Sequence, residues 1–401
     1  MTAPFANDVV VIGGGGHVGL PLSIVLADRG HRVVVYDVAD EAVSAVNSGR
    51  MPFHEPGAQQ MLERVLAESR LSATTDPAAV ASAEIVIVVI GTPVDEHLNP
   101  DPNAIVRALG ACLDHFRDGQ LVVLRSTVYP GVTALVERFF ADNGLAVDVA
   151  FCPERIAEHK ALEELIALPQ IVSSRTEAGR RRASMLFRTL TDEIVDLEPE
   201  EAELAKLFTN TWRYIKFAAA NQFYMMANDR GLDFDRIRTA LAFDYPRAAD
   251  LPGAGFAAGP CLLKDTMQLA AFSDNNFGLG HSAMLVNEGL PLYLVSRLKE
   301  RYDLGSLTVG ILGTAFKGGS DDIRSSLAYK LRRVLRFTAK EVLATDERVS
   351  HAVDSSLLPL ADVLERSDLL IIAAPHPEYA TLETDTPIVD IWNLRRNGVR
   401  V

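Results

Sequence analysis

One cysteine lies in a segment whose composition suits a reactive thiol. Cys261 belongs to the stretch LPGAGFAAGPCLLKD, in which glycine and alanine residues precede it and would let a substrate approach the backbone closely. Lys264 follows three positions later, and a nearby ammonium group favours the nucleophilic thiolate at neutral pH. Most lone cysteines are inert core residues, but this context favours a nucleophile. Cys112, within the helix-like RALGACLDHF, keeps the inert interpretation.

Two further pairs of polar residues leave more than one interpretation open. Lys206 and Asn210 are four residues apart in a helical pattern, so they share one helix face, and spacing alone favours an ordinary solvated edge. Glu154 and Arg155 follow what we predict to be the last strand of the N-terminal region. Adjacent charges of this kind usually form a surface ion pair, whereas the position after a strand favours a role in a site.

The elements that must position these groups begin with a dinucleotide-binding pattern. A short β-branched run leads into GGGGHVG, in which Gly14, Gly16 and Gly19 fit G-x-G-x-x-G, and a helical pattern follows. Such glycines permit a tight turn and close backbone approach to a pyrophosphate at the helix N-terminus. A second strand ends on Asp37, whose carboxylate can bind the adenosine ribose and repels a 2′-phosphate. The sequence therefore predicts NAD rather than NADP.

Two later strands end in small and hydroxylic residues. The predicted strand 85–90 ends in Gly91-Thr92-Pro93, and 121–124 ends in Arg125-Ser126-Thr127. Ligands of open parallel sheets gather at the carboxyl ends of strands, so we expect cofactor or substrate contacts here. Helix capping is the alternative role for Thr127.

The rest of the chain indicates two more domains. An apolar helical pattern runs from about 200 to 230, long enough to separate two domains and to form a dimer surface. A strand–helix alternation restarts near 305, without a G-x-G-x-x-G. We predict an α/β protein with two doubly wound Rossmann-like domains joined by a central α-helical domain with a long helix. The expected boundaries are 1–197 for NAD binding, 198–304 for the helical domain with Cys261, and 305–401 for the second Rossmann-like domain.

Composition excludes several classes of partner. The chain of 401 residues has a net charge of −14, from 39 basic and 53 acidic residues. This balance disfavours nucleic acid and anionic membranes as main partners. No apolar run is long enough to span a bilayer and the N-terminus does not resemble a signal peptide, so we expect a cytoplasmic protein. Three cysteines without a CxxC pair predict neither a disulfide framework nor a metal site.

The motifs together resemble the UDP-glucose/GDP-mannose dehydrogenase family over nearly the whole chain. They occur in the family's order: GGGHVGLPL, NSGRMPFHEPG, GTPVDE, RSTVYPG, FCPERIAEHKALEEL, AELAKLFTN, PCLLKD, LGTAFKGGSDDIRSS and DIWN. The resemblance implies an NAD-dependent, four-electron oxidation of a sugar C6 alcohol to a carboxylate. The aldehyde formed first would be captured by Cys261 as a thiohemiacetal, oxidised to a thioester and released by water.

The resemblance also implies catalytic roles at the motif positions. Lys206 and Asn210 would stabilise the oxyanion. Asp265, with Thr127, would position or deprotonate water, and Glu154 would add a further acid–base or water-orienting group.

The implied binding residues form two sets. Lys264 would support the thiolate or the substrate, and Arg247 would come from the neighbouring subunit, so that the active site needs a homodimer. The cofactor contacts are Gly14, Gly16, His17, Val18, Gly19, Asp37, Thr92, Pro93, Thr127, Lys264 and Arg324. The substrate contacts are Glu154, Arg155, Lys206, Asn210, Arg247, Phe256, Gly259 and Lys317.

The chain departs from the family pattern at a few positions. His17 replaces an aromatic residue in the glycine loop, Gln222 stands where a glutamate is common, and Pro260 replaces a serine or histidine next to the nucleophile. Ala257 and Ala258 stand where glycines are common. These changes bear on the identity of the sugar more than on the chemistry.

Three hypotheses follow for the function. The CPER segment and the Tyr-Pro-Arg sequence favour UDP-N-acetylmannosamine or UDP-N-acetylglucosamine as substrate over UDP-glucose. A two-electron dehydrogenase with a structural Cys261 is the enzymatic alternative. A non-catalytic nucleotide-sugar-binding protein is the alternative from another class.

Overall fold

The computed structural model describes residues 5–92, 94–95 and 100–398. The chain divides into two compact units, Met1–Phe208 and Thr209–Val401, which we call the N-terminal and C-terminal units. No helix among the described residues combines the length and apolar character needed to cross a bilayer.

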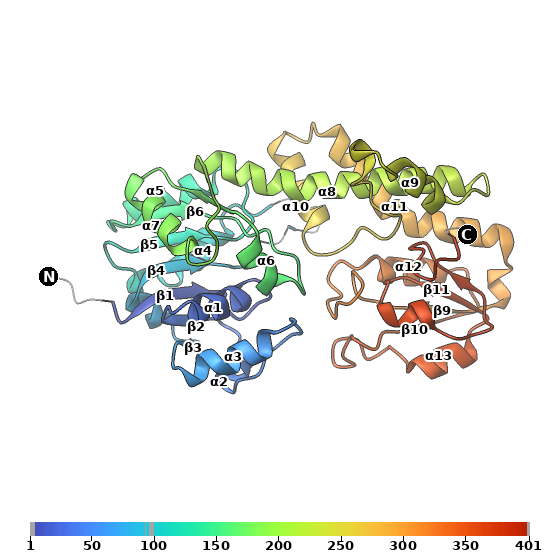
Figure 1. The fold of residues 1–401 in the computed structure, drawn as a ribbon, viewed down its shortest axis with the longest axis horizontal. Helices are drawn as coiled ribbons and strands as arrows, with labels where there is room; N and C mark the ends of the chain where they lie inside the picture. The colour runs from blue at the N-terminus through green and yellow to red at the C-terminus, as the bar shows by residue number, and fades with distance from the viewer. Residues whose placement is uncertain (1–4, 93, 96–99, 399–401) are drawn as a thin grey trace. The chain divides into compact units, whose positions relative to one another are not determined.

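The N-terminal unit is built on an eight-stranded sheet with the order β3-β2-β1-β4-β5-β6-β7-β8 (Figure 1). Neighbouring strands are parallel except β6 and β7. The order β3-β2-β1-β4-β5-β6 is that of a dinucleotide-binding sheet. The strands are β1 (Asn7–Ile12), β2 (Val33–Tyr36), β3 (Leu71–Thr74), β4 (Ala83–Val88), β5 (Leu121–Leu124), β6 (Asp148–Phe151), β7 (Gln170–Ser173) and β8 (Ile194–Leu197).

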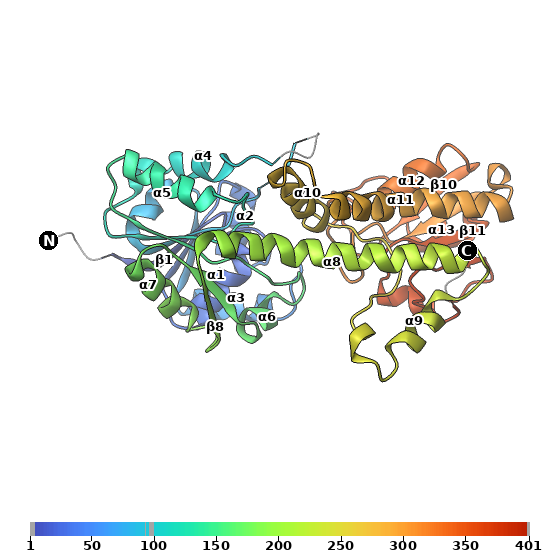
Figure 2. The ribbon, with the colours of Figure 1, turned by 90° about the horizontal axis from the view of Figure 1, so that it is seen from above.

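Helices cover both faces of this sheet, which explains the continuous apolar character of its strands. In β1, Val9 and Val11 pack in the core on one face, while Val10 and Ile12 pack in the core on the other. One core includes residues of α1, α2, α3, α6 and α7, and the other includes residues of α4 and α5 (Figure 2). The helices are α1 (Gly19–Asp28), α2 (Asp40–Asn47), α3 (Ala58–Ala67), α4 (Ala104–Gly110), α5 (Val132–Asp142), α6 (Ala161–Ala167) and α7 (Glu177–Phe187).

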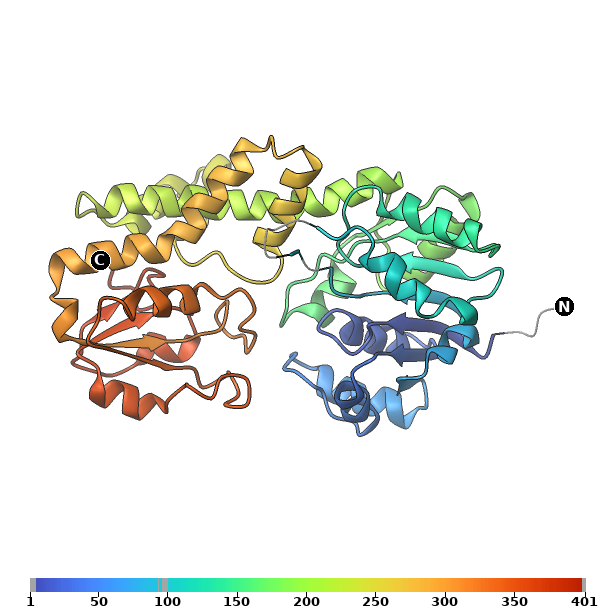
Figure 3. The same ribbon diagram turned by 180° about the vertical axis from the view of Figure 1, so that it is seen from behind.

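The C-terminal unit contains a smaller parallel sheet with the order β10-β9-β11-β12. Helix α12 packs in the core on one face and α13 in the core on the other (Figures 1 and 3). Its elements are α9 (Phe234–Ala242), α10 (Leu262–Phe272), α11 (Gly278–Arg301), β9 (Thr308–Leu312), α12 (Leu327–Leu335), β10 (Glu341–Thr345), α13 (Leu360–Arg366), β11 (Leu369–Ile372) and β12 (Ile388–Val389). The long helix α8 (Pro199–Asn228) begins in the N-terminal unit and continues into this one.

The predicted fold class is confirmed, with corrections in detail. The segment before Glu154 is not the last strand of the first sheet, because β7 and β8 follow it. Both are only four residues long, so they carry little periodic signal. Cys112 lies just beyond α4 rather than inside a helix, although it is buried as expected.

A buried glutamate fixes the start of α8 to the N-terminal unit. Glu203 is 1% exposed, and its carboxylate accepts hydrogen bonds from the backbone N–H of Gly131 at 2.7 Å and of Thr133 at 2.8 Å. The Thr133 hydroxyl donates a third bond at 2.6 Å. The N-cap residue of α5 is a glycine without a capping side chain, so Glu203 supplies the cap from α8.

Replacement of this carboxylate by an amide should therefore destabilise the protein. In Glu203→Gln the side-chain NH₂ group would face an N–H donor, and we expect the free energy of unfolding to fall by about 1–3 kcal/mol. Chemical denaturation measures this difference. The control is Glu365→Gln at an exposed position of α13, which should stay within about 0.5 kcal/mol of the unmodified protein. Equal losses in both variants would contradict the capping role.

Candidate active site

The glycine loop between β1 and α1 has the geometry that a dinucleotide requires. Gly13 turns the chain with φ +75°, and a Cβ at Gly19 would lie 2.7 Å from both the Gly13 carbonyl oxygen and the Gly14 Cα. Gly19 therefore allows α1 to pack closely on the loop. Gly16 is exposed, and a Cβ there would have its nearest neighbour 3.9 Å away. The loop thus leaves open space at the glycine that a pyrophosphate would approach.

The acidic residue after β2 lies beside this loop. Asp37 Oδ2 accepts a hydrogen bond from Gly15 N at 2.9 Å, and Oδ1 accepts one from Ala39 N at 3.0 Å. Val18, the N-cap residue of α1, makes no side-chain cap and leaves the helix terminus to a ligand. The ring of His17 stacks on Phe53 with centroids 4.1 Å apart. These residues fit NAD.

Hydroxyl groups connect the segments after β4 and β5. Thr92 Oγ1 donates to the Thr127 carbonyl oxygen at 2.6 Å, and Ser126 Oγ accepts from Ile90 N at 2.9 Å. Thr127 itself is half-buried, and α5 takes its cap from Glu203 rather than from Thr127. Pro93 lies outside the described residues.

Of the two interpretations of Glu154 and Arg155, the surface ion pair is not the one that the structure shows. Glu154 is 6% exposed and pairs with Arg125, whose side chain is fully buried after β5. Arg125 also donates to the Cys152 carbonyl oxygen and to Gln170 Oε1, both at 3.0 Å. A buried carboxylate is stable only when it accepts hydrogen bonds of this kind. The adjacent Arg155 does not supply one from its side chain, which donates to the Pro169 carbonyl oxygen. Burial lowers the pKa of Arg155.

The three cysteines have different environments. Cys261 is exposed at the N-cap position of α10, whereas Cys112 and Cys152 are buried. Burial raises the pKa of Cys152 to about 12 and also raises that of Cys112. Cys261 is thus the accessible thiol of the three.

A polar chain leads from α8 to the segment with Cys261. The carboxylate of Asp265 is fully buried, and its Oδ2 accepts a hydrogen bond from Asn210 Nδ2 at 2.5 Å. Lys264 Nζ lies 2.9 Å from Asp265 Oδ1. The structure therefore brings Asn210 of α8 together with Lys264 and Asp265 of the first turn of α10. Lys206 is half-buried one turn before Asn210 on α8.

The loop before Cys261 depends on a residue that we did not predict. Asn221 on α8 donates to the Gly255 carbonyl oxygen at 3.0 Å and accepts from Gly255 N at 2.9 Å. Phe256 is 4% exposed and packs edge-on against Trp392. Gly259 has φ +104°, and a Cβ there would lie 2.7 Å from the Phe316 ring. Asn221 directly follows the apolar run Phe217 to Ala220 of α8, and this change to a polar residue was the available signal for the contact.

The predicted cations of the C-terminal unit occupy different surroundings. Lys317 is half-buried, with Nζ 5.4 Å from the centre of the Phe316 ring. The same ring packs against Gly259, in the loop before Cys261. Arg324 is exposed and forms a two-pronged ion pair with Asp322 of its own loop. Arg247 is exposed, beside the ring of Tyr245.

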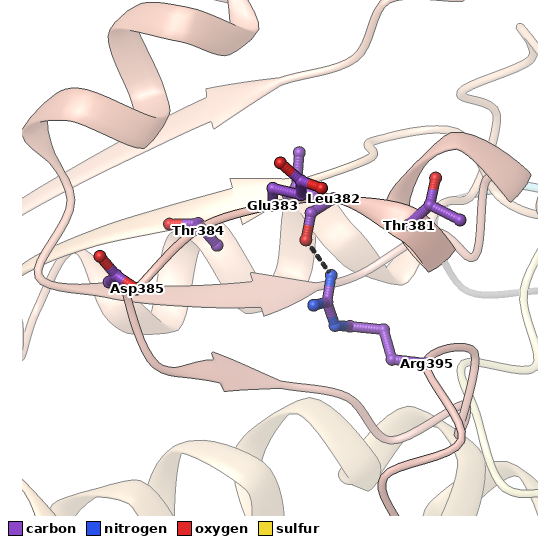
Figure 4. Close-up of a pocket in the computed structure, with 6 residues that line it drawn as sticks. All are labelled: Thr381, Leu382, Glu383, Thr384, Asp385 and Arg395. Carbon is purple, nitrogen blue, oxygen red and sulfur yellow. Dashed lines mark hydrogen bonds between the residues drawn. The ribbon is translucent and has the colours of Figure 1, made fainter.

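Two other features lie apart from these groups. A pocket formed by Thr381, Leu382, Glu383, Thr384, Asp385 and Arg395 contains none of the predicted site residues (Figure 4). Arg395 donates to the Leu382 carbonyl oxygen there at 2.7 Å. Among the described residues, no cluster of His, Cys, Asp and Glu side chains has the make-up of a metal site.

Comparisons with known proteins agree with this architecture. Three family models match in order: the NAD binding domain of the UDP-glucose/GDP-mannose dehydrogenase family at 7–191, its central domain at 200–288 and its UDP binding domain at 310–397. A UDP-N-acetyl-D-mannosamine dehydrogenase of Pyrococcus horikoshii is 30% identical, over 94% of this chain and 91% of that protein. A UDP-glucose 6-dehydrogenase of Haloferax volcanii is 29% identical, over 93% and 92%.

Solved structures show the same relationship. The UDP-D-ManNAc dehydrogenase of Pyrococcus horikoshii superposes with a TM-score of 0.87 at 30% identity, over 94% of this chain and 91% of that one. A UDP-glucose dehydrogenase of Pyrobaculum islandicum gives 0.88 at 29% identity, over 100% and 98%. The chain belongs to the UDP-glucose/GDP-mannose dehydrogenase family. It is an NAD-dependent nucleotide-sugar dehydrogenase with a UDP-binding domain, and the predicted family and cofactor are confirmed.

The two glycines of the dinucleotide loop should respond differently to an added methyl group. Gly19→Ala forces a Cβ against backbone atoms, so we expect the free energy of unfolding to fall by about 1–3 kcal/mol. Gly16→Ala has room and should stay within about 0.5 kcal/mol, but its methyl group occupies the path of the pyrophosphate and should raise the Kd for NAD. Denaturation and NAD titration of both variants test this. Unchanged NAD affinity in Gly16→Ala would contradict the assigned binding site.

Proposed function

We propose that this protein oxidises the C6 hydroxyl group of a UDP-N-acetylhexosamine to the uronate through an intermediate on Cys261. The observation that carries the proposal is the exposed Cys261 thiol at the start of α10. The first turn of this helix carries Lys264 and Asp265, and Asp265 accepts a hydrogen bond from Asn210 of α8. Relatives named UDP-N-acetyl-D-mannosamine dehydrogenase, and the CPER segment, support N-acetylmannosamine or N-acetylglucosamine as the sugar.

The chemistry requires a group that holds the sugar between two oxidations. NAD, which the glycine loop and Asp37 would hold, would supply the hydride acceptor for each of the two oxidations, so that one sugar consumes two NAD. The Cys261 thiolate adds to the C6 aldehyde, and the resulting thiohemiacetal is oxidised to a thioester. Water attacks the thioester carbon, the C–S bond breaks and the thiolate leaves, so the carboxylate is released and Cys261 is regenerated.

The neighbours of Cys261 have complementary roles in this proposal. Lys206 and Asn210 donate to the oxyanion that forms on the sugar carbon. Asn210 is oriented by its hydrogen bond to Asp265, and that carboxylate is balanced by Lys264. In this proposal Asp265 orients or deprotonates the attacking water, with Thr127 as a second water contact.

The other predicted contacts divide by their burial. The carboxylate of Glu154 already binds Arg125 and two backbone N–H groups, which favours an orienting role over proton transfer. The ring of Phe256 is buried, which favours a role in supporting the loop before Cys261 over a direct contact with the substrate. We propose Lys317, Arg155 and Gly259 as contacts of the nucleotide sugar, and Arg324 as a contact of the dinucleotide.

We also propose the domain division 1–197, 198–304 and 305–401 as the functional one. It assigns NAD, the nucleophile and the UDP group to successive parts of the chain, in the order of the three family models. The cytoplasmic location stays a prediction.

A panel of UDP- and GDP-sugars with NAD, read at 340 nm with mass analysis of the product, tests the function. We expect two NADH per UDP-N-acetylhexosamine and the uronate as product. Cys261→Ser should abolish net acid formation, because the serine hydroxyl group is not ionised at neutral pH and is a much weaker nucleophile than a thiolate. The control Cys112→Ala changes a buried cysteine and should still form acid.

Two outcomes would contradict the proposal. One NADH per sugar, with activity surviving in Cys261→Ser, would support the two-electron dehydrogenase. Binding of UDP-sugars by calorimetry without NADH from any member of the panel would support the non-catalytic alternative.

We further propose that the protein acts as a homodimer in which Arg247 reaches the neighbouring active site. Helices α8 and α9 expose large apolar side chains that a second copy could cover. Arg247 lies just beyond α9 and is exposed, with its guanidinium group beside the ring of Tyr245. The exposed apolar side chains are Phe208, Trp212, Phe223, Met226, Ile237, Leu241 and Phe243.

Mixing two inactive variants tests this arrangement. Arg247→Ala and Cys261→Ser dimers should each form little acid, but subunit exchange would create mixed dimers with one complete site. An equal mixture should then recover about a quarter of the unmodified activity. Sedimentation of each variant as a dimer is the control. A mixture that stays inactive although exchange has been verified would refute the supply of Arg247 by the partner.

A further inference from the structure

The loop that follows β9 is held at its start by a buried carboxylate from the next strand. Asp346 follows β10 and is 5% exposed. Its Oδ2 accepts hydrogen bonds from Thr314 N at 2.6 Å and Ala315 N at 3.0 Å. Burial would raise the pKa of Asp346, but the hydrogen bonds from His376 and from these backbone groups outweigh it and lower the pKa. Asp346 is therefore anchored as an anion.

The far end of the same loop is held by a histidine from a different strand. His376 follows β11 and is 2% exposed. Its Nδ1 accepts a hydrogen bond from Gly319 N at 3.0 Å, and its Nε2 lies 3.1 Å from Asp346 Oδ2. Because Nδ1 is an acceptor, the ring proton resides on Nε2, which donates to Asp346. The His376–Asp346 pair therefore forms hydrogen bonds with the loop on both sides of Lys317, at Thr314 and Ala315 before it and at Gly319 after it.

The loop also packs closely against the segment after β11, and only glycine fits at two of its positions. A Cβ at Gly318 would lie 2.2 Å from the Pro375 carbonyl oxygen, and a Cβ at Gly313 would lie 2.7 Å from the Ala374 Cβ. In the order β10-β9-β11-β12, β9 and β11 are the strands between which the chain order reverses. Ligands of open parallel sheets bind at this point, so the His–Asp pair lies where a nucleotide would be bound.

We propose that His376 is a positioning residue for the nucleotide sugar. The ring accepts at Nδ1 from Gly319 and contacts Asp346 through Nε2, which sets the conformation of the segment 314–319 and places the Lys317 ammonium group for the diphosphate of the substrate. His376 acts through the loop and does not touch the substrate. The proposal rests on the proposed function, because it assumes that Lys317 contacts a UDP-sugar.

Three substitutions separate the two hydrogen bonds of the ring. His376→Phe keeps an aromatic ring beside Tyr379 but removes both bonds. His376→Asn places an amide oxygen near the position of Nδ1 and can still accept from Gly319 N. His376→Gln places an amide NH₂ group near Nε2 and can still donate to Asp346. His351→Asn, at an exposed position of the same unit, is the control.

The measurements are calorimetric titration of the full-length protein with UDP, and steady-state kinetics with the UDP-sugar that the unmodified protein oxidises. For His376→Phe we expect the Kd for UDP and the KM for the sugar nucleotide to rise on the order of tenfold, as for the loss of one or two buried hydrogen bonds. The KM for NAD and kcat should change little. His376→Asn should recover most of the affinity, His376→Gln less, and the control should be unaffected.

The outcomes distinguish the inference from the function on which it rests. Unmodified protein that binds UDP and oxidises a UDP-sugar, together with unchanged UDP affinity in all three His376 variants, would overturn the inference alone. Equal loss of UDP and NAD binding in the three variants would show a general structural role and would also overturn it. If the unmodified protein neither binds UDP nor oxidises any UDP-sugar, the proposed function and the inference both fail.

Discussion

The hydrogen bond between Asn210 and the fully buried carboxylate of Asp265 is the interaction on which the candidate active site depends. A charge with no access to solvent is tolerated only where donors replace its lost water. Here the donors are Asn210 of α8 and Lys264. Because the Asp265 carboxylate must be hydrogen-bonded, it fixes α10 against the long helix. Cys261 begins the same helix turn, and its location follows from that bond.

The same device recurs at other segments of the protein. Glu203 fixes the start of α8 to α5, Glu154 fixes the segment after β6 to Arg125, and Asp346 fixes the loop after β9. Each carboxylate is buried and accepts hydrogen bonds from residues far away in the sequence. Loops at the carboxyl ends of strands have no ladder of their own, so long-range polar contacts of this kind give them one conformation.

The sequence was sufficient for the features that depend on local patterns. The β1–α1–β2 unit followed from the glycine spacing, strands β4 and β5 from their apolar runs, and α8 from its helical pattern to within two residues of both ends. The N-capping alternative for Thr127 was not realised, because Glu203 supplies that cap from 70 residues away. The partners of Arg125, Asn221 and His376 could not be predicted, because they are distant in the chain. The antiparallel pairing of β7 with β6 was missed for another reason, because a run of four residues does not show the direction of a strand.

The unequal burial of the cysteines has a consequence for the behaviour of the protein towards oxidants. Oxidation of cysteine follows thiolate character and access, and both are suppressed at Cys112 and Cys152. Peroxide damage is therefore concentrated on Cys261, the sulfur atom that the proposed chemistry uses. The enzyme would stop turning over while its fold stays intact, and a cellular thiol reductant could restore it from the sulfenic acid stage.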